Sequence, residues 1–335
     1  MTAAGKALAA IVVCAAALAA QTPAERSWKQ KIAAANQLLG QGNHAEAERI
    51  FLDVVEEAGT LSPRNPLLAA ALNDLGYCYQ DLGKAAEAER LFRRAARIWE
   101  QAEGQHEEDL LICLNNLAGL YVEARQYGKA EALLRGSITE RAAALEPNHP
   151  QRGYIARNLG KVYCTRRRFA DAEPLLLQSL AVLDRNFGPD HPEVAAAVNN
   201  LGALYLSTGR RAEAQAHFER ALAILESWAK PDTHGLATTL ANLSILAGLE
   251  QHWEVSKGYL NRALALVEKA FGPEDVLVGE ILWHQAAMLR KMQRKREAKE
   301  TETRAREILA LWPTYSSLHH TIDITELSAG RDRGK

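Results

Sequence analysis

Histidines are the residues whose type most suggests metal chemistry here, and two of them recur at a fixed spacing. His149 and His191 are each followed by proline and lie 42 residues apart. Because they occupy equivalent connectors of a repeated segment, they are spread along the chain and do not converge on one ion. We therefore expect them to form turns, and we predict no metal site. No paired carboxylates or other catalytic constellation can be named, so we also expect no enzyme activity and no cofactor.

The spacing of 42 residues runs through most of the chain. When the sequence is shifted against itself by this length, an asparagine-rich column, a leucine column and a tyrosine column align. A fixed period of this length indicates a stacked repeat architecture. The members of the leucine column are Leu75, Leu117, Leu159, Leu201 and Leu243.

Each copy of the repeat has the pattern of two helices joined by a tight turn. From Ala195 to Leu225, apolar residues fall at helical spacing in both halves of the copy. Gly209 lies in the polar break between them, where a left-handed helix end favours glycine. Small residues at Gly202 and Ala214 mark where the helices approach closely. One such pair cannot bury both of its faces, so the copies must stack on one another.

The spacing of leucine, glycine, tyrosine and alanine resembles the tetratricopeptide repeat over roughly residues 28 to 311. The usual period is about 34 residues, so each copy here is longer by about two helical turns. This length, and connectors such as 187–194, resemble kinesin light chains, although no coiled-coil heptads precede the array. The resemblance implies an all-α, right-handed superhelical solenoid of antiparallel helix pairs. It implies a peptide-binding array and no motor-cargo role.

The resemblance also implies where a ligand would lie. In the family, the first helix of each pair lines a concave groove. Asparagine amides there would pair with an extended peptide backbone, because an amide both donates and accepts. The groove residues carried over to this chain are Asn73, Asn115, Asn116, Tyr154, Arg157, Asn158, Lys161, Asn199 and Asn200.

Within this set, Arg157 and Lys161 lie one helical turn apart and would favour a carboxylate, from an acidic side chain or a C-terminus. Tyr154 is on the same face and could stack on the ligand. The alternative for Arg157 and Lys161 is a simple exposed pair. For the second asparagine column (Asn116, Asn158, Asn200 and Asn242), the alternative is a structural bond to the neighbouring repeat.

The first twenty residues differ in kind from the rest. Lys6 is their only charge and an apolar run extends to Ala20. This pattern is typical of a secretory signal peptide, too short to span a membrane, with cleavage after Ala19 or Ala20. Lipidation at Cys14 is the alternative, but the preceding valines lack the small residue that such sites need. We expect export to the periplasm or the medium, across a bacterial-type envelope.

After the signal peptide (1–20), we expect a spacer (21–27), an array of about six helix pairs (28–312) and a partly disordered tail (313–335). The formal net charge of −1 gives no reason to expect nucleic acid or an anionic membrane as a partner. Cys78, Cys113 and Cys164 lie in different columns, so we expect buried small hydrophobes and no disulfide framework.

These features predict an exported, non-enzymatic module that binds an extended peptide or partner segment in its concave groove. The partner would be a protein or peptide, acidic where it meets Arg157 and Lys161, with no membrane span after signal cleavage. The alternative is a structural assembly or scaffold protein that acts through self-association, as a homo-oligomer, or within an envelope complex. In a third hypothesis, the tail inhibits the groove by placing in it Ile322, Ile324 and Leu327.

Overall fold

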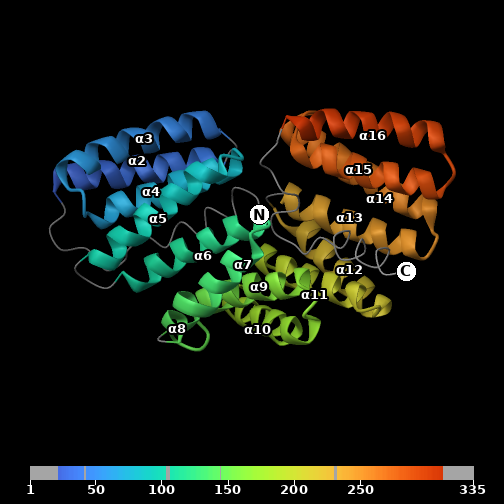
Figure 1. Ribbon diagram of the computed structural model, residues 1–335, viewed down its shortest axis with the longest axis horizontal. Helices are drawn as coiled ribbons and strands as arrows, with labels where there is room; N and C mark the ends of the chain where they lie inside the picture. The colour runs from blue at the N-terminus through green and yellow to red at the C-terminus, as the bar shows by residue number, and fades with distance from the viewer. Residues whose placement is uncertain (1–21, 41–42, 103–105, 144, 230–231, 312–335) are drawn as a thin grey trace. The chain divides into compact units, whose positions relative to one another are not determined.

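The computed structural model describes residues 22–40, 43–102, 106–143, 145–229 and 232–311. The expected signal peptide and tail therefore lie outside the described residues. Throughout the described part of the chain the regular elements are helices, joined as antiparallel pairs (Figure 1). The predicted all-α solenoid of helix pairs is confirmed. The chain divides into two compact units, residues 1–147 and 148–335.

The first unit contains three helix pairs among its described residues, and the second helix of its third pair is interrupted. Consecutive helices pack against each other, and the first helices α2, α4 and α6 also make contacts in series. The elements are α2 (Pro23–Gly40), α3 (His44–Leu61), α4 (Pro66–Asp81), α5 (Ala85–Gln101), α6 (Glu107–Glu123), α7 (Tyr127–Leu133), the π-helical turn η1 (Leu134–Ile138) and α8 (Thr139–Ala142).

The second unit contains four helix pairs among its described residues, each with a continuous second helix. The first helices α9, α11, α13 and α15 contact one another in series. The elements are α9 (Pro150–Thr165), α10 (Phe169–Phe187), α11 (Pro192–Ser207), α12 (Arg211–Ser227), α13 (Thr233–Leu249), α14 (Trp253–Phe271), α15 (Val276–Lys291) and α16 (Lys295–Ala310).

Small residues let the two helices of a pair approach closely, as the sequence predicts. A Cβ atom added to Gly202 would lie 2.6 Å from Cε1 of Phe218, a buried side chain on the partner helix. A Cβ atom added to Gly160 would lie 2.7 Å from Leu176 Cδ2. Since real Cβ atoms do not approach side chains this closely, glycine at this column fixes the spacing of the pair.

The histidines of the connectors cap helices, as expected. Nδ1 of His191 accepts a hydrogen bond from the backbone N–H of Glu193 at 3.1 Å, and His149 does the same for Gln151 at 3.3 Å. Each is followed by proline in the first helical turn. Burial lowers the pKa of His191, partly offset by the charge of Glu193, so the neutral acceptor form is favoured.

The turn between the helices of a pair has one left-handed residue, and these residues also recur every 42 positions. Gly209 has φ of +86°, which confirms the expected left-handed helix end. Glycine, which has no Cβ, adopts this conformation without strain, whereas arginine or glutamine pays a steric cost. The column comprises Gly83, Arg125, Arg167, Gly209, Gln251 and Gln293.

Two expectations about the array are wrong. Most of the expected spacer 21–27 is helical, because α2 begins at Pro23. Thr22 and Glu25 form a reciprocal cap: the Thr22 N–H donates to Glu25 Oε2 at 2.8 Å, and the Glu25 N–H donates to Thr22 Oγ1 at 3.2 Å. In addition, the described residues form seven helix pairs, one more than expected.

The three cysteines of the array are free and buried, as predicted. They lie on the first helices α4, α6 and α9, and burial raises the pKa of the thiols of Cys113 and Cys164. Within the described part of the chain, no helix combines the length and hydrophobicity that a membrane crossing requires.

Candidate functional site

The predicted binding residues lie on first helices of both units, and most are less accessible than an open groove requires. Asn73, Asn115 and Asn116 belong to the first unit and the other six to the second. Buried are Asn73, Tyr154, Arg157, Lys161, Asn199 and Asn200; partly exposed are Asn115, Asn116 and Asn158.

In the first unit, two of the asparagines bridge neighbouring repeats. Asn116 on α6 donates its Nδ2 to Oδ1 of Asn73 on α4, at 3.1 Å. The amide of Asn73 in turn donates to Oδ1 of Asp74, at 3.1 Å. Asn116 therefore makes the neighbouring-repeat bond that was the structural alternative for its column. Asn73 is committed to the same network, so its side chain stabilises the stack of helices.

Asp74 is an unusual member of this column, because it places a carboxylate where later repeats have asparagine. It is buried and accepts a second hydrogen bond, from Nδ2 of Asn36 on α2 at 2.8 Å. Burial raises the pKa of Asp74 to about 6, against the opposing effect of its bonds to Asn36 and Asn73, and the charge of Asp109 adds to the increase. Asp74 thus links three repeats through a carboxyl that is costly to ionise.

The second unit repeats the bridge on α11 and α13. Asn242 donates its Nδ2 to Oδ1 of Asn199, at 3.2 Å, again between residues 43 positions apart. Asn199 is only 1% exposed, and its own Nδ2 has no hydrogen-bond partner. The bridge between first helices is therefore a recurring device, made from one amide of each asparagine column.

Arg157 takes the place of the bridging asparagine on α9, and its surroundings differ from those expected. Its Nη1 forms an ion pair with Oε2 of Glu193 on α11 at 2.8 Å, and the two side chains are 8% and 3% exposed. A guanidinium has no acceptor, so the asparagine bridge is replaced by a buried ion pair. The alternative of a simple exposed pair is wrong, since Arg157 and Lys161 are both buried.

The same ion pair changes the expected electrostatics of the site. Because Glu193 neutralises Arg157, this pair adds no net positive charge to the site. The Arg157 guanidinium also lies over the ring of Tyr154, 5.1 Å from its centroid. Burial and then the charge of Glu193 raise the pKa of Tyr154, so the phenol stays protonated. Tyr154 stacks on Arg157, within the protein.

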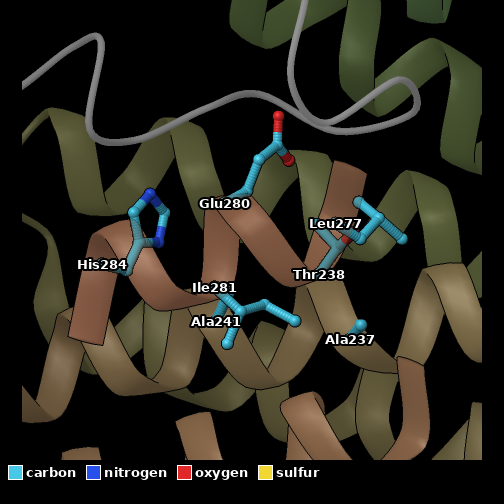
Figure 2. Close-up of a pocket in the computed structure, with 7 residues that line it drawn as sticks. All are labelled: Ala237, Thr238, Ala241, Leu277, Glu280, Ile281 and His284. Atoms are coloured by element: carbon cyan, nitrogen blue, oxygen red, sulfur yellow. The ribbon is translucent and has the colours of Figure 1, made fainter. Parts of the chain in front are cut away.

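A small pocket opens between α13 and α15 (Figure 2). Its cavity volume is about 10 Å³, room for about one water molecule, and it is partly open to solvent. One carboxylate, that of Glu280, stands among mainly apolar neighbours and is only 8% exposed. The pocket therefore combines apolar walls with a single acidic group. It is lined by Ala237, Thr238, Ala241, Leu277, Glu280, Ile281 and His284.

This pocket was not predicted from the sequence, although one 42-residue column passes through it. Glu280 lies in the same 42-residue column as Tyr154, Ala196 and Thr238, so each first helix of the second unit contributes one member. This column and that of Arg157 and Asn199 define what we call the first-helix face of the second unit. Glu193 was also missed, because its pairing with Arg157 spans 36 residues and follows no column.

Among the described residues, no group of three or more histidine, cysteine and acidic side chains could hold a metal ion. The groups on the first-helix face are amides, charged side chains and apolar side chains. These are groups for recognition by hydrogen bonds, charge and contact.

The sequence matches the tetratricopeptide repeat family over four overlapping stretches, residues 31–101, 67–139, 109–185 and 151–227. Together they cover more than half of the chain, so this chain belongs to the tetratricopeptide repeat family. The fold of this family is that of a protein–protein interaction module. Among curated protein sequences, none matches the chain.

Solved structures share the fold. BtubC (BKLC) from P. vanneervenii is 25% identical, with a TM-score of 0.54, over 75% of this chain and 94% of its own. A putative kinesin light chain from Podosopora anserina is 24% identical, with a TM-score of 0.49, over 62% and 97%. A Rap protein complexed with Competence and Sporulation Factor is 16% identical, with a TM-score of 0.68, over 85% and 75%. The predicted repeat of the long, kinesin-light-chain-like type is confirmed.

Proposed function

We propose that this chain is a non-enzymatic interaction module that binds an extended segment of a protein partner along the first-helix face of its second unit. The observation that carries the proposal is the series of first helices α9, α11, α13 and α15, which contact one another and repeat the same 42-residue columns. An extended segment that crosses several of these helices would meet equivalent positions at regular intervals. A Rap protein of this fold is complexed with Competence and Sporulation Factor, which is compatible with such a role.

We propose further that Lys161 gives the site a preference for a carboxylate of the partner. Lys161 lies one helical turn beyond Arg157 on α9 and carries a positive charge. Lys161 is buried, and a charge in a poorly solvated position attracts an opposite charge more strongly than a surface charge does. The carboxylate would come from an acidic side chain or a C-terminus.

The test is binding of the purified chain to a library of extended peptides that differ in charge. We expect peptides with one glutamate to bind more tightly than the same peptides with glutamine, and Lys161→Gln to remove this difference. Lys299→Gln on the exposed side of α16 is the matched control, because it removes one positive charge from a second helix. If no peptide binds, the proposed function is wrong; if Lys161→Gln leaves the difference intact, Lys161 is not its source.

Self-association is the second candidate. Large apolar side chains are exposed on second helices of the second unit, at Leu177 on α10 and Val255 on α14. Such surfaces can pair with another copy of the chain. Sedimentation over a range of concentrations separates the two candidates, because assembly predicts a concentration-dependent mass and a peptide-binding module does not require one.

We also propose that the chain is exported, on the basis of the apolar segment that ends at Ala20. Expression of the whole chain in a bacterial host, followed by fractionation and N-terminal sequencing, tests this. We expect the exported protein to begin at Ala20 or Gln21. An uncleaved chain that stays in the cytoplasm would contradict the proposal.

A further inference from the structure

The last first helix of the array, α15, carries an exposed tryptophan in a column whose earlier members in the second unit are buried. Trp283 follows Arg157, Asn199 and Ala241 in the same 42-residue column. These three residues are 7%, 1% and 3% exposed, whereas Trp283 is 42% exposed. A large aromatic ring therefore meets solvent at a position that the earlier repeats of the second unit cover.

The earlier members of this column each contact the following first helix. Arg157 on α9 pairs with Glu193 at the start of α11. Asn199 on α11 accepts a hydrogen bond from α13, and Ala241 on α13 lines the small pocket against α15. Trp283 therefore occupies the side of α15 on which a further first helix would pack, and the described chain ends one residue after α16.

The surface around Trp283 carries an unbalanced positive charge. The guanidinium of Arg306 on α16 lies 5.9 Å from the centroid of the Trp283 ring. Arg306 and Arg290 both pair with Glu302, so two cations share one carboxylate. Arg290 comes two helical turns after Trp283 on the same side of α15, whereas Glu280 lines the pocket with α13 and is buried. This side of α15 thus offers aromatic surface beside one cation in excess.

The chain itself contains a segment of complementary composition, beyond the described residues. Residues 321–327 have the sequence Thr-Ile-Asp-Ile-Thr-Glu-Leu, which combines three large aliphatic side chains with two carboxylates and no cation. The aliphatic side chains would shield the indole from water, and a carboxylate would compensate the excess guanidinium. A purely apolar segment would leave that charge uncompensated, and a basic one would be repelled by it.

The segment is also close enough in the chain to reach this surface. Arg306 lies five residues before Leu311, about 8 Å along the helix axis. Residues 312–320 follow Leu311 and can span up to about 30 Å when extended. Because the segment is tethered, its effective concentration at Trp283 exceeds that of a second copy of the chain in dilute solution.

We propose that residues 321–327 of this chain dock on the exposed side of α15, cover Trp283 and place a carboxylate beside Arg290 and Arg306. The segment takes the place that the next first helix would have in a longer array. The terminal repeat thereby gains the polar outer face that a stacked array needs at its end. This contact requires no partner, so it holds or fails independently of the proposed peptide binding.

The accessibility of the indole in the full chain tests this contact. Trp228, which is 38% exposed at the end of α12, is the matched reference. The chain is labelled with 5-fluorotryptophan, Trp283→Phe and Trp228→Phe identify the two ¹⁹F resonances, and a soluble nitroxide broadens those of accessible rings. If the segment is docked about 90% of the time, the Trp283 resonance should broaden about tenfold less in the intact chain than in Ile322→Ser/Leu327→Ser. The Trp228 resonance should broaden equally in both.

Charge reversal tests how the segment is held. Asp323→Lys/Glu326→Lys should expose Trp283, because the added cations face Arg290 and Arg306. Asp332→Lys, which removes a carboxylate outside the segment, should leave Trp283 protected. All of these substitutions lie outside the packed helices, so circular dichroism should show the same helix content in every variant.

The possible results separate the occupants of this surface. If the Trp283 and Trp228 resonances broaden equally in the intact chain, nothing covers Trp283 and the proposal is wrong. Protection that survives in Ile322→Ser/Leu327→Ser would assign the cover to another segment and also overturn it. Protection that is lost on dilution would assign the cover to a second copy of the chain, with the same consequence.

Discussion

The two units follow the same 42-residue columns and depart from them in different ways. In the second unit, the second helix α12 runs without interruption from Arg211 to Ser227. Its counterpart in the first unit is split into α7, η1 and α8, and Gly136 within η1 has non-helical angles, φ −79° and ψ −105°. Conversely, the first unit keeps the asparagine bridge between α4 and α6. In the second unit, α9 has Arg157 in the column that supplies the accepting asparagine of this bridge.

The comparison teaches that the stacking of pairs tolerates local departures as long as the close-contact columns persist. Gly76 in the first unit and Gly202 in the second both place a helix directly against a phenylalanine of the partner helix. Polar columns vary more, because several chemical solutions join neighbouring first helices: an amide pair, a carboxyl with two amides, or a buried ion pair. Each departure can be reversed by a single substitution.

The largest effect is expected at the ion pair. Arg157→Ala would leave the nearly inaccessible carboxylate of Glu193 without its cation, so we expect a loss of about 3 kcal/mol in the free energy of unfolding. Chemical denaturation measures this loss. Adding Glu193→Gln to Arg157→Ala should recover part of it, because the isolated charge is gone.

The matched control for this ion pair is Arg294→Ala. Arg294 pairs with Glu297 through two hydrogen bonds, but the side chains are 35% and 50% exposed. Because solvent screens an exposed pair, we expect a much smaller loss of stability for Arg294→Ala than for Arg157→Ala. Equal losses for the two variants would show that Arg157 and Glu193 are solvated, which would also return Arg157 to the set of accessible binding residues.

The next effect concerns the carboxyl that interrupts the asparagine column. The pKa of Asp74 is about 6 in the folded chain, above its ordinary value of 3.8, so its contribution is full below about pH 4 and is lost as the pH rises through about 6. Asp74→Asn carries no charge. Its new amide can still bond to Asn36 if the Asn36 side chain rotates so that its oxygen accepts from the new amide. We therefore expect the variant to be more stable than the wild type at neutral pH, by up to about 3 kcal/mol.

Denaturation of both proteins across this pH range measures the difference. It should be small at about pH 4 and grow towards pH 7, because only the wild type ionises a buried group. A difference that is independent of pH would mean that Asp74 titrates at its ordinary pKa and that the substitution acts through hydrogen bonding alone.

The sequence predicts the elements of the fold well, because they depend on residues close together in a repeated pattern. Gly202 identified the close contact, Gly209 the left-handed turn, and His191 the helix cap. The start of α2 was also within reach, since Thr22 and Glu25 have the spacing of a capping box. Each of these effects is set by local geometry.

The site was harder to predict, because burial and pairing depend on the neighbouring repeat. Nothing in the spacing of Arg157 shows that Glu193, at the start of another helix, reaches back to it. The asparagine columns could be located, but the direction of their hydrogen bonds follows from how the helices stack. Glu280 illustrates the same difficulty: its column is visible in the sequence, and its pocket exists only once α13 and α15 pack together.

The smallest effect is expected at the interrupted helix. Gly136 shares its column with Arg94, Gln178 and Arg220, which all lie within continuous second helices. A Cβ atom on Gly136 would meet nothing within 4 Å, so a side chain fits. Because glycine is a poor helix former, Gly136→Gln should favour a continuous helix and stabilise the chain by about 1 kcal/mol. Denaturation and amide hydrogen exchange over residues 134–139 measure this.

The control must separate helix propensity from removal of the π-helical turn, and Gly258 provides it. This residue also has free space around its Cβ position, but it lies in the regular helix α14. Gly258→Gln increases helix propensity and changes nothing else, so it should leave hydrogen exchange over residues 134–139 unchanged. A larger gain at Gly136, with slower exchange there, shows that the glycine causes the π-helical turn. If the two variants gain equal stability and hydrogen exchange at 134–139 is unaffected, packing against α6 imposes the turn. In α6, Ala118 occupies the repeat position that Gly202 has in α11.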